Sequence, residues 1–299
     1  MTATPPLRSG RILTLAAAAI GATLTAVVAA QQPTFSTRRE VVRVDALVTD
    51  RNRPVRGLRA GDFAVLDSGV PQTVTDVGFQ ELPLNVMLAL DASVSMSGDR
   101  LDHLRDAARA VLDTMRSGDK AAVLTFDDAI TALQPLTANV VLARESVNRI
   151  GASQRLSGGG TALRDAIFTA LAMSSAESTR SLLLVFTDGL DTSSWLTTER
   201  LLATARRSNA VVYAVSAAGL DEDDVLRRLA EITGGGVVEI GKTDALRATF
   251  LTIIDEFRQR YVVSFSPEGV PAGGWHPLTV RIKGRSVTVR ARPGYARGP

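Results

Sequence analysis

Cysteine is absent from the 299 residues, and histidine occurs only twice. The lack of cysteine excludes disulfides, thiolate metal sites, cysteine nucleophiles and a lipidated N-terminal cysteine. His103 falls in an expected helix and His276 in a turn region rich in Gly and Pro. These positions do not favour a Ser-His-Asp catalytic triad.

A strong excess of charge of one sign is also missing. The formal net charge is +3, and Lys and Arg form no long run. The sequence therefore indicates no nucleic-acid partner, since such a partner needs a concentrated basic surface. Hydrophobic residues make up 45% and charged residues 22%, the balance of a globular protein with one large domain or two modest ones.

The longest apolar run lies near the N-terminus. Arg8 and Arg11 precede an apolar stretch from residue 12 to residue 30, which ends in small residues. We expect residues 1–30 to be a secretory signal peptide cleaved near Ala30. The alternative is an uncleaved membrane anchor at residues 12–30, because the run is long for a signal peptide. In both cases the rest of the chain lies outside the cytoplasm, either periplasmic or secreted.

Two segments, residues 31–82 and residues 261–299, show strand patterns and no helix pattern. In both, apolar residues alternate with polar ones. One hairpin is expected around Asp67-Ser68-Gly69 and another around Lys283-Gly284-Arg285. Neither segment buries enough apolar surface alone, so we expect the two to pair in one small β domain.

Between these segments, residues 83–260 alternate apolar strands with amphipathic helices. The runs at 86–90 and 181–186 are apolar enough to be buried on both sides. Such alternation predicts an α/β class, with a doubly wound, mainly parallel, Rossmann-like sheet covered by helices on both faces. This domain would be an insertion in the β domain.

Oxygen-bearing side chains follow the ends of these strands. Asp91, Ser93 and Ser95 form an Asp-x-Ser-x-Ser segment after the first buried strand. Thr161 follows a run of glycines and opens a helix, and Asp188 closes another strand in Thr-Asp-Gly. Ligands of open α/β sheets bind at this strand end. Hydroxyl and carboxylate oxygens suit Mg²⁺ better than zinc.

These three motifs, in this order, resemble the von Willebrand factor type A domain and its metal-ion-dependent adhesion site. The resemblance implies that Ser93, Ser95 and Thr161 bind a metal directly, and that Asp91 and Asp188 act mostly through water. The metal would be Mg²⁺, with Mn²⁺ or Ca²⁺ as alternatives. Neutral hydroxyl ligands leave the ion electrophilic, so an Asp or Glu carboxylate of a protein partner is the natural remaining ligand.

The flanking segments carry a second resemblance. Val-Thr-Asp from residue 48, Pro-Val-Arg-Gly-Leu from residue 54 and Asp-Ser-Gly-Val-Pro-Gln from residue 67 are similar to secreted bacterial proteins labelled "VWFA-related". Tyr-Val-Val-Ser-Phe from residue 261 and Val-Arg-Ala-Arg-Pro-Gly-Tyr from residue 289 are similar to the end of that group. The two resemblances together cover nearly all of the expected mature chain, and they imply an adhesion-type binding module rather than an enzyme.

Two other classes stay open. In a phosphoryl-transfer enzyme, Asp91 would be the nucleophile, but Ser93 occupies the place of a second acid. The glycines before Thr161 could cradle a phosphate, but no Lys follows as in a P-loop. A structural envelope protein would use the metal only for stability.

Neighbouring residues have simpler interpretations. Ser97 or Asp99 is expected to cap the helix that follows, and the adjacent acids at 127 and 128 are expected to be solvated. The loop from Gly189 to Trp195, which carries Asp191, is expected to form part of the partner-facing rim.

Overall fold

The computed structural model describes residues 40–79, 82–151, 159–175, 180–220 and 224–298. The expected signal peptide at residues 1–30 lies outside this range. Among the described residues, no helix is long and apolar enough to cross a membrane.

A six-stranded sheet forms the centre of the α/β part, with the strand order β11-β10-β9-β6-β7-β8. All neighbouring pairs are parallel except β7 and β8, which are antiparallel. Every residue of β6 and β9 is buried, which explains the continuous apolar runs at 86–90 and 182–186. The strands are β6 (Leu84–Asp91), β7 (Lys120–Phe126), β8 (Ile130–Thr137), β9 (Arg180–Thr187), β10 (Ala210–Ser216) and β11 (Gly236–Glu239).

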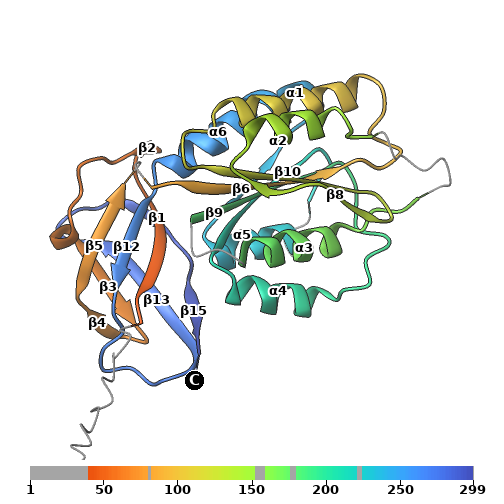
Figure 1. The fold of residues 1–299 in the computed structure, drawn as a ribbon. Coiled ribbons are helices and arrows are strands. Elements are labelled where there is room, and N and C mark those ends of the chain that lie inside the picture. The colour runs from red at the N-terminus through yellow and green to blue at the C-terminus, as the bar shows by residue number, and fades with distance from the viewer. Residues whose placement is uncertain (1–39, 80–81, 152–158, 176–179, 221–223, 299) are drawn as a thin grey trace, which may run out of the picture. The chain divides into compact units, whose positions relative to one another are not determined.

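Helices cover both faces of this sheet, so the expected doubly wound α/β class is confirmed (Figure 1). One hydrophobic cluster joins Leu88 of β6 to Leu104 and Phe250, on the face covered by α1, α2 and α6. A second joins Met87 to Ile167 and contains residues of α3, α4 and α5. The helices are α1 (Asp99–Asp113), α2 (Val140–Val147), α3 (Leu163–Ser175), α4 (Thr198–Arg207), α5 (Val225–Thr233) and α6 (Leu246–Arg258), and η2 (Thr243–Ala245) is a short 3-10 turn before α6.

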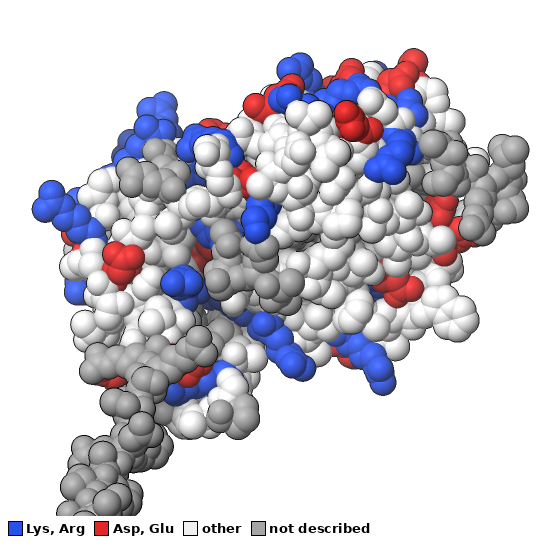
Figure 2. Space-filling model, in the orientation of Figure 1, with Lys and Arg blue, Asp and Glu red and all other residues white. Residues whose placement is uncertain are grey.

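The outer surface of the helices carries charges of both signs. On the face that Figure 2 shows, basic and acidic side chains are interspersed over α1 and α2. Two ion pairs of α1, Arg105–Asp102 and Arg109–Asp106, each join residues three positions apart. This surface agrees with the small net charge of the sequence.

The remaining strands come from both sides of the α/β part and form two further sheets. The first has the order β14-β1-β12-β5, with β2 also paired to β1, and the second has the order β15-β13-β3-β4. A third hydrophobic cluster, which includes Val44, Phe63 and Val263, contains residues from both sheets. The elements are β1 (Val42–Asp50), β2 (Arg53–Pro54), η1 (Ala60–Asp62), β3 (Phe63–Asp67), β4 (Val70–Gln72), β5 (Val74–Phe79), β12 (Tyr261–Phe265), β13 (Gly274–Ile282), β14 (Thr288–Arg290) and β15 (Gly294–Arg297).

One of the two expected hairpins is confirmed and the other is wrong. Strands β3 and β4 pair around Ser68 and Gly69, which both have positive φ, as a two-residue turn of type I′ requires. The turn at Lys283-Gly284-Arg285 does not join paired strands, because β13 pairs with β3 and β15 whereas β14 pairs with β1. The chain passes there from one sheet to the other. A hairpin and a change of sheet give the same alternation of polar and apolar residues, so the sequence does not distinguish them.

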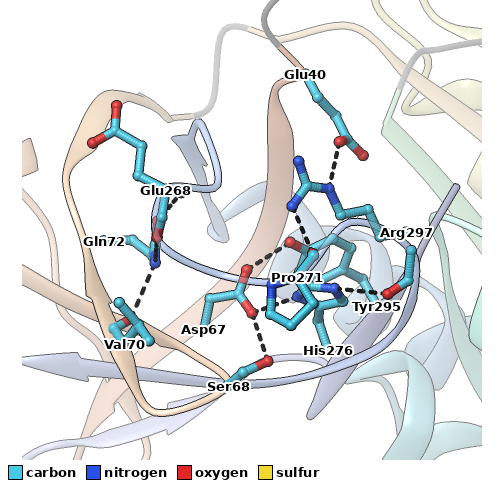
Figure 3. Close-up of polar contacts among 11 residues, drawn as sticks. Glu40, Asp67, Ser68, Val70, Gln72, Glu268, Pro271, His276, Tyr295 and Arg297 are labelled. Carbon is cyan, nitrogen blue, oxygen red and sulfur yellow. Dashed lines mark hydrogen bonds and ion pairs between the residues drawn. The ribbon is translucent and has the colours of Figure 1, made fainter. Parts of the chain in front are cut away.

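A buried carboxylate ties three strands of the second sheet together (Figure 3). The side chain of Asp67, at the end of β3, accepts hydrogen bonds from the Tyr295 hydroxyl at 2.6 Å and from the Ser68 hydroxyl at 3.0 Å. His276 Nδ1 lies 2.8 Å from the same carboxylate. Burial and the neighbouring Asp67 carboxylate raise the pKa of Tyr295. His276 therefore belongs to β13 and to a polar core cluster, not to a turn.

Candidate metal centre

The candidate site begins where β6 and β9 end side by side. Asp91 closes β6 and is fully buried. Its Oδ1 accepts a hydrogen bond from the backbone N–H of Ser93 at 3.0 Å, and its Oδ2 accepts one from the Thr187 hydroxyl at 2.8 Å. Thr187 is the last residue of β9, the parallel neighbour of β6. The sequence did not indicate this contact of Thr187, because it depends on which strands are neighbours.

A chain of hydrogen bonds connects the loop after β6 to the loop after β9. The hydroxyl oxygens of Ser93 and Ser95 lie 3.0 Å apart, and the Ser95 hydroxyl donates to Asp188 Oδ1 at 2.9 Å. Ser95 and Asp188 are 93 positions apart in the sequence. The parallel pairing of β6 and β9 brings these loops to the same edge of the sheet, as the strand-end argument predicts.

Thr161 approaches the same edge from the segment before α3. Its hydroxyl oxygen lies 4.0 Å from the point where a Cβ on Gly189 would be, so it faces the loop after β9. The Thr161 backbone N–H donates to the Thr192 hydroxyl at 2.8 Å, and its carbonyl accepts from the Thr192 N–H at 3.0 Å. These bonds hold the start of α3 against the loop after Asp188.

The loop after β9 leaves no room for a side chain at Gly160. A Cβ at this position would lie 2.6 Å from the Thr192 hydroxyl oxygen and 2.9 Å from Ser193 Cβ, closer than real Cβ atoms come. The loop after β9 therefore lies close against the backbone of Gly160.

Arg100 is a component of the site that the sequence did not indicate. Its guanidinium Nη2 lies 2.5 Å from Asp188 Oδ2, and the Asp188 side chain is 1% exposed. Arg100 stands in the first turn of α1, which starts after Gly98 (φ 57°) without a side-chain cap, so the expected capping role of Ser97 or Asp99 is wrong.

The electrostatics of the edge favour a cation. Burial raises the pKa of Asp91, hydrogen bonds from Ser93 and Thr187 lower it, and the negative charge of Asp188 raises it. A divalent cation between these groups would stabilise both carboxylates in their charged form. Hydroxyls and carboxylates are the donor types that hard cations prefer. The candidate set therefore fits Mg²⁺ chemically, although the described residues contain no group of three or more His, Asp or Glu suited to a metal.

The loop from Gly189 to Trp195 is held by two carboxylates. Asp191 accepts hydrogen bonds from the Arg164 N–H and the Ser194 hydroxyl, each at 2.7 Å. Asp165 accepts from the N–H groups of Trp195 and Leu196, each at 2.9 Å. Asp191 is thus a structural loop carboxylate. The Trp195 side chain, by contrast, is held out from the surface and is 96% exposed.

Residues 85–250 match the sequence model of the von Willebrand factor type A domain. The chain belongs to this family. A curated relative, the human inter-alpha-trypsin inhibitor heavy chain H4, is 25% identical over 173 residues, which cover 53% of this chain and 18% of that protein. The chain thus spans less than a fifth of this relative's length.

Two solved structures show the same fold as this type A domain protein. A von Willebrand factor type A protein from Catenulispora acidiphila aligns with 88% of this chain and 74% of its own, at 15% identity and a TM-score of 0.51. Proximal thread matrix protein 1 from the mussel byssus aligns with 62% of this chain and 48% of its own, at 17% identity and a TM-score of 0.53. That structure has zinc in its metal-ion-dependent adhesion site.

Proposed function

We propose that this type A domain binds a divalent cation and, through it, an acidic residue of a protein partner. Ser93, Ser95 and Thr161 would contact the ion directly, with Asp91 and Asp188 acting mostly through water. Mg²⁺ is the proposed ion, and Mn²⁺ or Ca²⁺ are the alternatives. The observation that carries the proposal is the hydrogen-bonded chain from Ser93 through Ser95 to Asp188, which joins two loops at the sheet edge.

The donor set supports binding rather than catalysis. Hydroxyl oxygens are neutral, so an ion held by them keeps most of its positive charge and attracts an outside carboxylate. Both loops also carry exposed apolar side chains. Val94 lies in the loop after Asp91, and Leu190 and Trp195 lie in the loop after Asp188. Such side chains suit contact with a protein surface around the acidic residue.

Metal binding can be tested on the protein alone. Titration with Mn²⁺, followed by electron paramagnetic resonance, should show saturable binding that Mg²⁺ displaces. Ser93→Ala should weaken this binding about tenfold or more, because it removes a proposed direct ligand, and should leave the circular dichroism spectrum unchanged. Ser146→Ala is the matched control, since Ser146 is a buried serine in α2 whose hydroxyl bonds its own helix. Equal Mn²⁺ affinity in the Ser93 variant and the wild type would contradict the proposal.

Partner binding separates this function from the alternatives. A pull-down from the native cell envelope should recover a protein that EDTA releases and that the Ser93→Ala variant does not retain. A structural metal site would change only the melting temperature on chelation. An enzyme would turn over a phosphoester, and we infer no such activity. Recovery of the same partner in the presence of EDTA would contradict the metal-dependent mechanism.

We also propose that the protein acts in the periplasm or outside the cell. The support is the sequence of residues 1–30, with basic residues before an apolar run. Mass spectrometry of the protein purified from its native source should find a mature N-terminus near Gln31. A full-length chain in the membrane fraction would favour an anchor, and a full-length chain in the cytoplasm would contradict both.

A further inference from the structure

A second site is suggested by a cavity of about 300 Å³ whose lining contains none of the candidate metal ligands. It is lined by the start of β1, the start of β9, the end of α4 and the segment around β15. The charged lining residues are mostly arginines: Arg43, Arg180, Arg207, Arg292, Glu40 and Asp45.

The two acids of the cavity are already paired. Asp45 lies 2.6 Å from Arg180 Nε, and both side chains are almost buried. Glu40 lies 2.7 Å from Arg297 Nε, an arginine outside the lining (Figure 3). Within the part of the chain that the structure describes, Arg43, Arg207 and Arg292 form no ion pair with a carboxylate. The lining therefore has an uncompensated excess of positive charge.

Part of this positive charge is buried, because it belongs to Arg292. The residue is only 8% exposed. Its guanidinium donates to the carbonyls of Gly294 at 2.7 Å and Arg206 at 2.8 Å, and to Asn209 Oδ1 at 3.1 Å, all neutral acceptors. Burial lowers the pKa of Arg292 to about 10, and the charge of Asp45 raises it. A buried cation with neutral hydrogen-bond partners is stabilised by an anion in the adjoining cavity.

We propose that this cavity binds a small phosphate-bearing ligand. Once the pairs Asp45–Arg180 and Glu40–Arg297 are discounted, the positive charges of Arg43, Arg207 and Arg292 remain. A phosphate dianion carries more negative charge than a single carboxylate and would neutralise more of this excess. Guanidinium groups bind phosphate oxygens through paired N–H donors. The remaining wall includes Val42 and Val262, so the cavity also accepts an uncharged body such as that of a sugar phosphate.

Calorimetric titration of the full chain with inorganic phosphate tests the proposal. One saturable site is expected, with weaker binding of sulfate and acetate at the same ionic strength. Glucose 6-phosphate is the second probe. Tighter binding than inorganic phosphate would assign the site to a phosphate ester, and equal binding would assign it to free phosphate. An absence of saturable phosphate binding in the wild type would overturn the proposal.

Arg43→Gln and Arg207→Gln locate the site. Both residues are exposed and form no ion pair among the described residues, so the variants should fold. Each should raise the Kd for phosphate about threefold to tenfold. Arg247→Gln is the control, because Arg247 is an exposed arginine of α6 outside the cavity. Equal effects of all three substitutions would show a non-specific charge effect and would also overturn the proposal. None of these residues belongs to the candidate metal centre, so the outcome is independent of metal binding.

Discussion

At the scale of single residues, Arg100 bears on the proposed metal binding through its contact with Asp188. Its guanidinium contacts one oxygen of Asp188, and the Ser95 hydroxyl contacts the other. A divalent cation that uses Asp188, directly or through water, would compete with this guanidinium for the same carboxylate. Arg100 would therefore set part of the energetic cost of the proposed metal binding.

Replacement of this arginine should tighten metal binding. Arg100→Gln removes the competing cation, and we expect the Mn²⁺ dissociation constant to fall about threefold to tenfold, the range for a half-exposed charged contact. Arg109→Gln is the matched control, since Arg109 lies in the same helix, pairs with Asp106 and is 42% exposed compared with 43% for Arg100. Unchanged or weaker Mn²⁺ binding in Arg100→Gln would show that the arginine does not compete with the ion.

At the scale of elements, the order of strands and helices in the α/β part was predictable. The centres of β6 and β9 are continuous apolar runs, and the helices have clear apolar faces, so local pattern was sufficient. The turn after Ile282 was not predictable, because a hairpin and a change of sheet have the same alternation of polar and apolar residues.

The candidate site was predictable in part. The Asp-x-Ser-x-Ser segment could be placed at a strand end from the sequence. The contacts of Thr187 and Arg100 could not be predicted, since they depend on which elements lie side by side.

The packing of the segment before α3 against the loop after β9 yields a prediction for Gly160. Gly160→Ala should lower the free energy of unfolding by about 1–3 kcal/mol, because the new methyl group would overlap Thr192 and Ser193. It should also weaken Mn²⁺ binding, because Thr161 would move. Gly241→Ala is the control, since no atom lies within 4 Å of the point where its Cβ would be and its φ is not positive. Urea denaturation would measure both variants, and equal stability would refute the packing argument.

At the scale of the whole molecule, strands from both ends of the described chain share one sheet. β1 pairs with β12, and β12 pairs with β5. We propose on this basis that residues 31–82 and 261–299 form one β domain and that residues 83–260 are inserted in it. The pair Arg180–Asp45 connects the two parts, because Arg180 opens β9 and Asp45 lies in β1.

Loss of this pair should destabilise the protein. Asp45→Ala leaves the Arg180 guanidinium, which is 5% exposed, with the Phe257 carbonyl but without its carboxylate. We expect the free energy of unfolding to fall by about 2–4 kcal/mol. Asp113→Ala is the comparison, because Asp113 pairs with Arg144 on the surface, and it should cost less than about 1 kcal/mol. Urea denaturation would measure the free energy of unfolding of both variants. Similar losses would show that the Arg180–Asp45 pair does not stabilise the contact between the β strands and the α/β part.

The pairing of Tyr261 with Phe79 has a consequence for the geometry of the proposed insertion. The polypeptide leaves the β scaffold after Phe79 and re-enters it at Tyr261, so both crossings occur at one rung of a single ladder. In the proposed insertion, the two ends of the inserted domain would therefore lie about 5 Å apart, the spacing of neighbouring strands.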